Sequence, residues 1–119
     1  MTLSVTPSTP SGLSQDGVAL ELWGVRVASA AVNDGWTESL VEQLDAYLRY
    51  GVNALTVFYQ GSSGGYVPGF SHDGREIDPG IRRRMERLVT AAAEKGLVVV
   101  VGIFYQRARL GSRDAYLRA

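Results

Sequence analysis

The fold is decided by one stretch of the chain, Gly96-Leu97-Val98-Val99-Val100-Val101-Gly102-Ile103-Phe104-Tyr105-Gln106. It is apolar and rich in β-branched residues, has no polar alternation and is short for a helix, which is typical of a parallel strand covered on both faces. We expect it to be a central strand. Its end, Phe104-Tyr105-Gln106, repeats the earlier triplet Phe58-Tyr59-Gln60, and each follows a helix-like stretch closed by a glycine. The sequence therefore predicts a repeated helix-then-strand unit and an α/β fold.

Two further apolar stretches precede that one in the chain, near residues 20–30 and 54–60. We predict three parallel strands in chain order, near residues 20–30, 54–60 and 97–105, with helices at 36–50 and 79–95 on one side of the sheet. The competing interpretation is a doubly wound, flavodoxin-like sheet. In that arrangement the first strand lies between the other two, and helices cover both faces.

Helical spacing and end signals support the two predicted helices. The apolar stripe of the first consists of Trp36, Leu40, Val41, Leu44, Tyr47 and Leu48. Gly51 suits the position that follows the end of this helix. Before the second helix, Asp78 offers a capping oxygen, and Pro79 occupies the first helical position, where a missing N–H costs nothing.

The two ends of the chain differ from this repeated pattern. Residues 1–11 are rich in Ser, Thr and Pro and predict a flexible leader. Asp16-Gly17 predicts a hairpin over Leu13–Leu20 that caps one end of a sheet. A third helix is expected from Ser112, and the chain ends inside it, which suggests an incomplete domain over residues 12–119.

Composition excludes several classes of function. The chain has 119 residues with 12 basic and 12 acidic groups, so net charge favours neither nucleic acid nor membrane as a partner. The arginines at 82–84 and 87 predict a solvated helix face rather than a phosphate or RNA patch. Without cysteine and with His72 as the sole histidine, we expect no metal and no other cofactor. The opening residues lack the features of a secretory signal, which predicts a cytoplasmic protein.

Candidate binding residues follow the predicted strands. In β–α repeats the carboxyl ends of the strands meet at one end of the sheet, where ligands bind. The residues at these ends are Arg26, Ser29, Tyr59, Gln60, Tyr105, Gln106 and Arg107. An aromatic ring beside an amide suits a carbohydrate, because a sugar offers both a C–H face and hydroxyls. The alternative is that Tyr59 and Tyr105 only close the top of the core.

The segment at residues 61–77 is long for a strand-to-helix connection, and long loops of this kind often bind ligands. It adds Tyr66 and His72 to the candidate substrate-binding residues. Its glycines are not followed by the Lys-Ser/Thr of a phosphate-binding loop. Glycoside hydrolysis usually needs two carboxylates across the scissile bond. The acids expected near strand ends or in this segment are Asp34, Asp73 and Glu76, and none has an evident partner.

These segments, taken in order, resemble a known family. The matching segments are the Leu13–Leu20 hairpin, Leu22-Trp23-Gly24-Val25-Arg26, Tyr50-Gly51-Val52-Asn53, and Lys95-Gly96-Leu97 followed by Val98–Phe104. Over roughly residues 12–110 the chain is similar to the N-terminal third of cellulase-like TIM-barrel glycoside hydrolases. Thr56, Gly102 and Phe104 replace the arginine, aspartate and histidine of the corresponding motifs, which indicates a remote member of that superfamily.

The resemblance implies the first three β/α units of a (β/α)8 TIM-barrel fold, and carbohydrate as the partner. It also implies a parent protein that hydrolyses glycosides. The catalytic glutamates of the family lie on the fourth and seventh strands, so no catalytic residue is assigned here and the chain alone is expected to be inactive. The alternative function is a non-catalytic carbohydrate-binding or interaction module with a flavodoxin-like fold. We also expect self-association through an exposed strand edge, because Val98–Ile103 is long, uncharged and β-rich.

Overall fold

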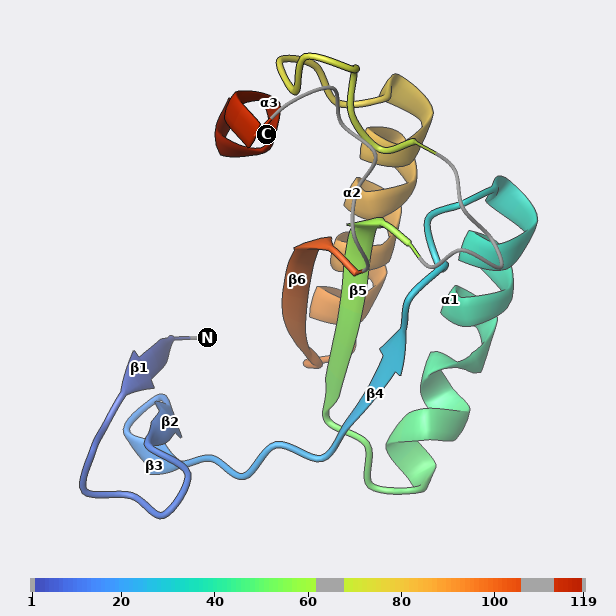
Figure 1. Cartoon of the computed structure of the whole chain (residues 1–119). Coiled ribbons are helices and arrows are strands. Elements are labelled where there is room, and N and C mark those ends of the chain that lie inside the picture. The colour runs from blue at the N-terminus through green and yellow to red at the C-terminus, as the bar shows by residue number, and fades with distance from the viewer. Residues whose placement is uncertain (1, 62–67, 106–112, 119) are drawn as a thin grey trace.

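The protein is an α/β structure with two separate three-stranded sheets. The computed structural model describes residues 2–61, 68–105 and 113–118. Along the chain, the elements are β1 (Leu3–Val5), β2 (Leu13–Gln15), β3 (Val18–Ala19), β4 (Gly24–Val27), α1 (Asp34–Arg49), β5 (Ala54–Gln60), α2 (Pro79–Glu94), β6 (Val98–Phe104) and α3 (Arg113–Arg118). Figure 1 shows the small N-terminal sheet set apart from the α/β layer pair.

The larger sheet has the predicted consecutive order. β4 pairs in parallel with β5, and β5 pairs in parallel with β6. Since β5 lies between β4 and β6, the flavodoxin-like order, which needs the first strand in the centre, is wrong. The expectation that Val98–Phe104 is the central strand is also wrong, because β6 is an edge strand among the described elements.

One apolar core joins this sheet to α1 and α2, which lie on the same side of it (Figure 1). Buried residues recur at helical spacing: α1 contributes Leu40 and Leu44, and α2 contributes Ile81, Met85, Leu88, Ala91 and Ala92. They pack against Leu55 and Val57 of β5. Each fully buried leucine in this cluster is worth about 1.5–3 kcal/mol relative to an exposed one.

The ends of both helices follow from local sequence. Asp78 accepts a hydrogen bond from the Ile81 N–H (2.8 Å), with Pro79 at the start of α2, as predicted. Asn33 caps α1 in the same way by accepting from the Trp36 N–H (2.8 Å). Gly51 follows α1 with φ +84°, a left-handed conformation that suits glycine.

The opposite face of the parallel sheet carries no described helix or strand. Val25 and Val27 of β4 pack on the core cluster, so by alternation Arg26 lies on this helix-free face. Thr56 is paired with Arg26 and therefore lies on the same face. In the described residues the sheet is thus covered on one face, not on both as the apolar run predicted.

The N-terminal residues differ from the expected leader. Leu3–Val5 form β1, which pairs antiparallel with β2, so part of residues 1–11 belongs to a sheet. The predicted hairpin is confirmed between β2 and β3, with Asp16 at φ 50° and Gly17 at φ 81° in its turn. None of these strands contacts β4, β5 or β6, so the hairpin does not cap the parallel sheet.

The arginines of α2 link the two helices. Arg87 forms a two-pronged pair with Glu38 of α1 (3.0 and 3.0 Å), and Arg83 donates to Asp34 at 3.0 Å. Arg84 is largely buried, and its Nε donates to the Ala31 carbonyl at 2.6 Å. This face is therefore partly an interhelical ion-pair network rather than simply a solvated surface.

The described C-terminal part consists of the short helix α3. Its Ala115 is fully buried, and its backbone lies against Gly74. Ser112, the expected cap of this helix, lies outside the described residues. None of the helices in the described part is long and apolar enough to cross a membrane.

Candidate functional site

Two of the predicted binding residues meet across the helix-free face of the sheet. The Arg26 guanidinium carbon lies 5.2 Å from the centre of the Tyr105 ring, within cation–π range. The same ring packs edge-on against Phe58, with centroids 5.0 Å apart. This contact is possible because Gly102, the partner of Phe58 in the strand register, leaves room for its ring. A cation and two aromatic rings therefore form a compact cluster on the bare sheet face.

Two other predicted residues have structural contacts. Tyr59 packs on the apolar core and lies 6.2 Å from Phe70, whose ring is 5.2 Å from Phe104. Gln60 is 1% exposed, and its Oε1 accepts from the Gly69 N–H at 3.1 Å. These contacts agree with the interpretation in which Tyr59 closes the top of the core.

The two Phe-Tyr-Gln triplets do not lie side by side. Phe58 pairs with Gly102 and Gln60 pairs with Phe104, so the second triplet begins where the first one ends. The sheet register therefore separates Tyr59 from Tyr105. The Tyr59 ring packs on the apolar core, whereas the Tyr105 ring contacts Phe58 on the opposite face of the sheet.

The remaining predicted residues lie in or near the long connections. Tyr66, Gln106 and Arg107 lie outside the described residues. His72 is exposed in the turn enclosed by the bridge between Phe70 and Ile77. Among the predicted residues that the structure describes, Arg26 and Tyr105 are in contact, whereas Tyr59 packs on the core and His72 lies in an exposed turn.

The carboxylates near the sheet end are held as ion-pair or turn acceptors. Hydrogen bonds from Arg83 and Arg84 lower the pKa of Asp34. The hydroxyl of Ser71 and the backbone N–H of Arg75 lower the pKa of Asp73. Glycosidic bond cleavage needs a proton donor with a raised pKa. The pKa values of Asp34 and Asp73 are both lowered, so neither carboxyl group suits that role. Within residues 2–61, 68–105 and 113–118, no three His, Cys, Asp or Glu side chains lie together as a metal-binding cluster.

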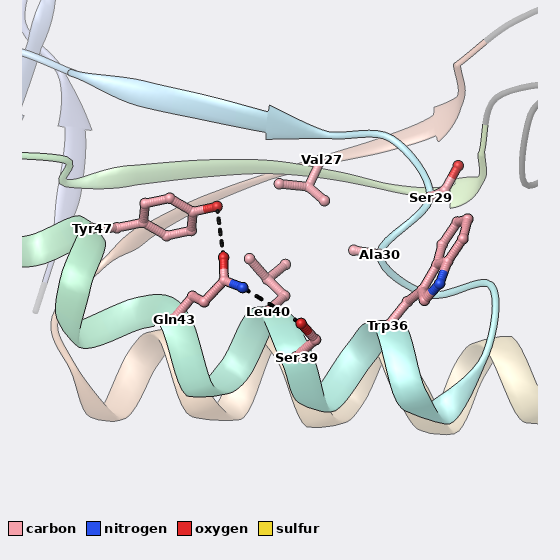
Figure 2. Close-up of a pocket in the computed structure, with 8 residues that line it drawn as sticks. All are labelled: Val27, Ser29, Ala30, Trp36, Ser39, Leu40, Gln43 and Tyr47. Atoms are coloured by element: carbon pink, nitrogen blue, oxygen red, sulfur yellow. Dashed lines mark hydrogen bonds between the residues drawn. The ribbon is translucent and has the colours of Figure 1, made fainter.

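A groove of about 260 Å³ lies between α1 and the end of the edge strand β4. It is lined by Val27, Ser29, Ala30, Trp36, Ser39, Leu40, Gln43 and Tyr47 (Figure 2). Val27, Ala30 and Leu40 form the apolar part of the lining, whereas Trp36, Ser39, Gln43 and Tyr47 add an indole, an amide and hydroxyls. Trp36 is 48% exposed, so much of its surface is open to solvent.

The polar groups of the groove form a row along α1. Figure 2 shows Tyr47 donating to the Gln43 side-chain oxygen (3.4 Å), while the Gln43 nitrogen donates to the Ser39 hydroxyl (3.5 Å). The three residues are spaced i, i+4, i+8, which places them on one side of the helix. Both bonds are long, so the amide can exchange them for contacts with a ligand at low cost.

We name Trp36, Ser39, Gln43 and Tyr47 the α1 groove residues. The sequence patterns assigned Trp36 and Tyr47 to the buried stripe and attached no role to Ser39 or Gln43. The signal that could have revealed them is the polar row at four-residue spacing, next to a tryptophan in the first turn of α1.

Comparisons with protein-family models, with curated proteins and with solved structures found no match.

Proposed function

We propose that this chain binds carbohydrate without hydrolysing it, and that the α1 groove is the binding site. The observation that carries the proposal is the half-exposed Trp36 ring beside the Ser39–Gln43–Tyr47 row in an open groove. A sugar ring has apolar C–H faces and polar hydroxyl edges, so it suits an indole next to amide and hydroxyl groups.

Each α1 groove residue has a distinct role in this proposal. Trp36 supports one face of the sugar ring. Gln43 supplies both a donor and an acceptor, and the hydroxyls of Ser39 and Tyr47 can each donate or accept. A groove of about 260 Å³ is below the ~300–1,000 Å³ usual for drug-sized ligands, which favours one or two sugar rings.

We further propose that the α/β part corresponds to the first three β/α units of a glycoside hydrolase-like TIM barrel. The parallel order β4-β5-β6 and the common side of α1 and α2 support this proposal. The resemblance to glycoside hydrolases is the reason for proposing carbohydrate as the ligand. The proposed lack of turnover rests on Asp34 and Asp73, whose pKa values are lowered and therefore do not suit a proton donor.

The binding test uses tryptophan fluorescence. The chain has two tryptophans, so Trp23→Phe leaves Trp36 as a single reporter inside the groove. Trp23 is 67% exposed and its side chain is outside the groove, so this change should leave the site intact. Titration with cello-, xylo- and mannooligosaccharides should give a saturable change, with a dissociation constant of about 0.1–10 mM, as expected for about 3–5 kcal/mol of binding free energy.

Matched variants on α1 separate specific binding from a general effect. Gln43→Ala should weaken binding about tenfold, as expected for loss of hydrogen bonds worth about 1–1.5 kcal/mol. Glu42→Ala, on the same helix but outside the groove, should bind like the parent. If the two variants behave alike, the proposed site is wrong. Release of nitrophenol from aryl-glycosides by the purified chain would contradict the proposed lack of turnover.

The second candidate function is an interaction module. The observation that favours it is the Trp36 side chain, a large apolar group that is 48% exposed at the groove and that an apolar side chain of a partner protein can cover. A fluorescence response of Trp36 that never saturates with any glycan up to about 50 mM would reject carbohydrate binding and leave this candidate.

A further inference from the structure

One wall of the α1 groove is formed by chain that belongs to no helix or strand. Residues 28–33 connect β4 to α1, and two of them, Ser29 and Ala30, line the groove. Figure 2 shows this β4–α1 connection running from the end of β4 past Ser29 and Ala30 to Trp36 in the first turn of α1. The path of the connection therefore sets the shape of the groove beside the indole.

Arg84 of α2 holds the end of the connection. Its Nε donates to the Ala31 carbonyl at 2.6 Å, and a terminal guanidinium nitrogen donates to the Val32 carbonyl at 3.3 Å. The Arg84 side chain is 13% exposed, so these hydrogen bonds are largely shielded from water. Hydrogen bonds from a charged donor are stronger than those between neutral groups. The second helix thus fixes the backbone that leads into the first.

Gly61, directly after β5, holds the start of the connection by close packing. A Cβ at position 61 would lie 2.5 Å from the Ala28 carbonyl oxygen and 3.1 Å from the Ser29 Cα. These are backbone atoms, which cannot move aside as the end of a flexible side chain can. The missing side chain of Gly61 therefore allows the connection to lie directly against the end of β5.

Local hydrogen bonds join the connection to the first turn of α1. The Thr37 hydroxyl is buried and donates to the Ala30 carbonyl at 2.8 Å. The Asn33 side chain accepts from the Trp36 N–H at 2.8 Å. The position of Trp36 is therefore coupled to that of the connection.

We propose that Arg84 is a positioning residue of the α1 groove, and that it acts with Gly61 to hold the β4–α1 connection in the shape that admits a sugar. This inference rests on the proposed binding of carbohydrate at the groove. Neither Arg84 nor Gly61 lines the groove. Both act on affinity through order, because a groove that is already shaped loses less binding free energy to ordering of the protein.

The affinity test uses the Trp23→Phe chain, in which Trp36 is the single reporter. Arg84→Met and Gly61→Ala should each raise the dissociation constant for an oligosaccharide that the parent binds by about three- to tenfold, the cost of ordering the connection on binding. Arg84→Lys should recover part of the affinity, because an ammonium can still donate to one carbonyl. Arg82→Met, at an exposed arginine of the same helix, should bind like the parent.

Gly102→Ala separates positioning from a general loss of stability. An alanine at position 102 must displace the Phe58 ring, and both residues lie outside the groove, so this variant is destabilised elsewhere. It should bind like the parent at a temperature at which circular dichroism shows every variant to be folded. If Gly102→Ala weakens binding as much as Arg84→Met does, Arg84 acts through stability alone and the proposal is wrong.

Acrylamide quenching of Trp36 tests the positioning without a ligand. Trp36 is 48% exposed, and release of the connection should expose more of the indole. The quenching constants of Arg84→Met and Gly61→Ala should therefore exceed that of Arg82→Met. A parent that binds no oligosaccharide would reject the proposed function and leave this comparison intact. Equal quenching of Arg84→Met and Arg82→Met would overturn the positioning role of Arg84, as would equal affinities of the two variants for a sugar that the parent binds.

Discussion

Arg26 and Tyr105 come from the two opposite edges of the parallel sheet, yet the guanidinium carbon lies 5.2 Å from the ring centre. The contact crosses β5, and Phe58 of β5 packs against the Tyr105 ring in an edge-to-face arrangement. The three side chains cover part of the sheet face on which no described helix packs. A cation over an aromatic ring at such a site is worth about 0.5–1 kcal/mol.

The first prediction concerns that contact. In a double-mutant cycle with Arg26→Met and Tyr105→Leu, the coupling energy from urea unfolding should be about 0.5–1 kcal/mol. The control cycle pairs Tyr105→Leu with Arg49→Met, at an exposed position near the end of α1, and should give no coupling. Equal coupling in the two cycles would show that the Arg26 contact does not contribute to stability.

The second prediction concerns Gly102. A Cβ at this position would lie 2.2 Å from two ring atoms of Phe58, so Gly102→Ala must displace that ring. We expect a loss of about 1–3 kcal/mol in the free energy of unfolding, as for other overpacked sites. In a Phe58→Leu background the same change should cost less, because the obstructing ring is gone.

Gly35→Ala is the matched control for Gly102→Ala. Gly35 lies in α1, and its nearest neighbouring atom, the Asn33 side-chain oxygen, would be 3.4 Å from an added Cβ. Alanine reduces the freedom of the unfolded chain, so this variant should be stabilised by about 0.4–1 kcal/mol. A Gly102→Ala variant that gains stability in the same way would contradict the described packing of Phe58.

The third prediction concerns Arg84, whose side chain is 13% exposed. It donates to the carbonyls of Ala31 (2.6 Å) and Val32 (3.3 Å), which precede α1. Arg84→Met leaves both carbonyls without this donor and should cost about 1–3 kcal/mol in urea unfolding. Arg84→Lys should recover only part of the loss, since an ammonium cannot reproduce the guanidinium fork.

Arg82→Met provides the control on the same helix. Arg82 is 68% exposed and pairs with Glu86, so its removal should change the free energy of unfolding by no more than about 0.5 kcal/mol. Equal losses for Arg82→Met and Arg84→Met would mean that the buried contacts of Arg84 are not the source of its effect.

The fourth prediction is a dependence of stability on pH. Hydrogen bonds from Arg83 and Arg84 hold the pKa of Asp34 below its unfolded value of about 3.9. A lowered folded-state pKa stabilises the protein above the unfolded pKa, and this stabilisation is lost as the pH falls through the folded pKa. Asp34→Asn should therefore lower the melting temperature at pH 6 and flatten its decline below about pH 4.

Two controls accompany the Asp34→Asn measurement: added salt, and a substitution of a second carboxylate. Because Asp34 is exposed, added salt should reduce the difference between the parent and Asp34→Asn at pH 6. Glu21→Gln, in the exposed segment between the two sheets, should leave the slope of the pH profile unchanged. A pH profile of Asp34→Asn that coincides with the parent would contradict the role of this ion pair.

Local sequence determined the helices, their ends and the first hairpin. Each of these features depends on residues within a few positions of one another. They are the apolar spacing of α1 and α2, the Asp78 cap with Pro79, and the Asp16-Gly17 turn. The consecutive order of three parallel strands was also predicted, from the repeated helix-then-strand pattern. Backbone preferences and caps act over one or two helical turns, so a single sequence contains the information for them.

Only the tertiary structure decided which of these residues meet and which remain exposed. Val98–Phe104 looked like a central strand because an apolar run records hydrophobicity but not the number of neighbours that pair with it. The register separated Tyr59 from Tyr105, although their triplets are identical, and brought Arg26 onto the Tyr105 ring. Trp36 matched the buried stripe of α1 but stands at the mouth of a groove, because no described element covers the outer side of β4. Strand register and burial depend on partners far away in the chain, and periodicity within one element cannot specify them.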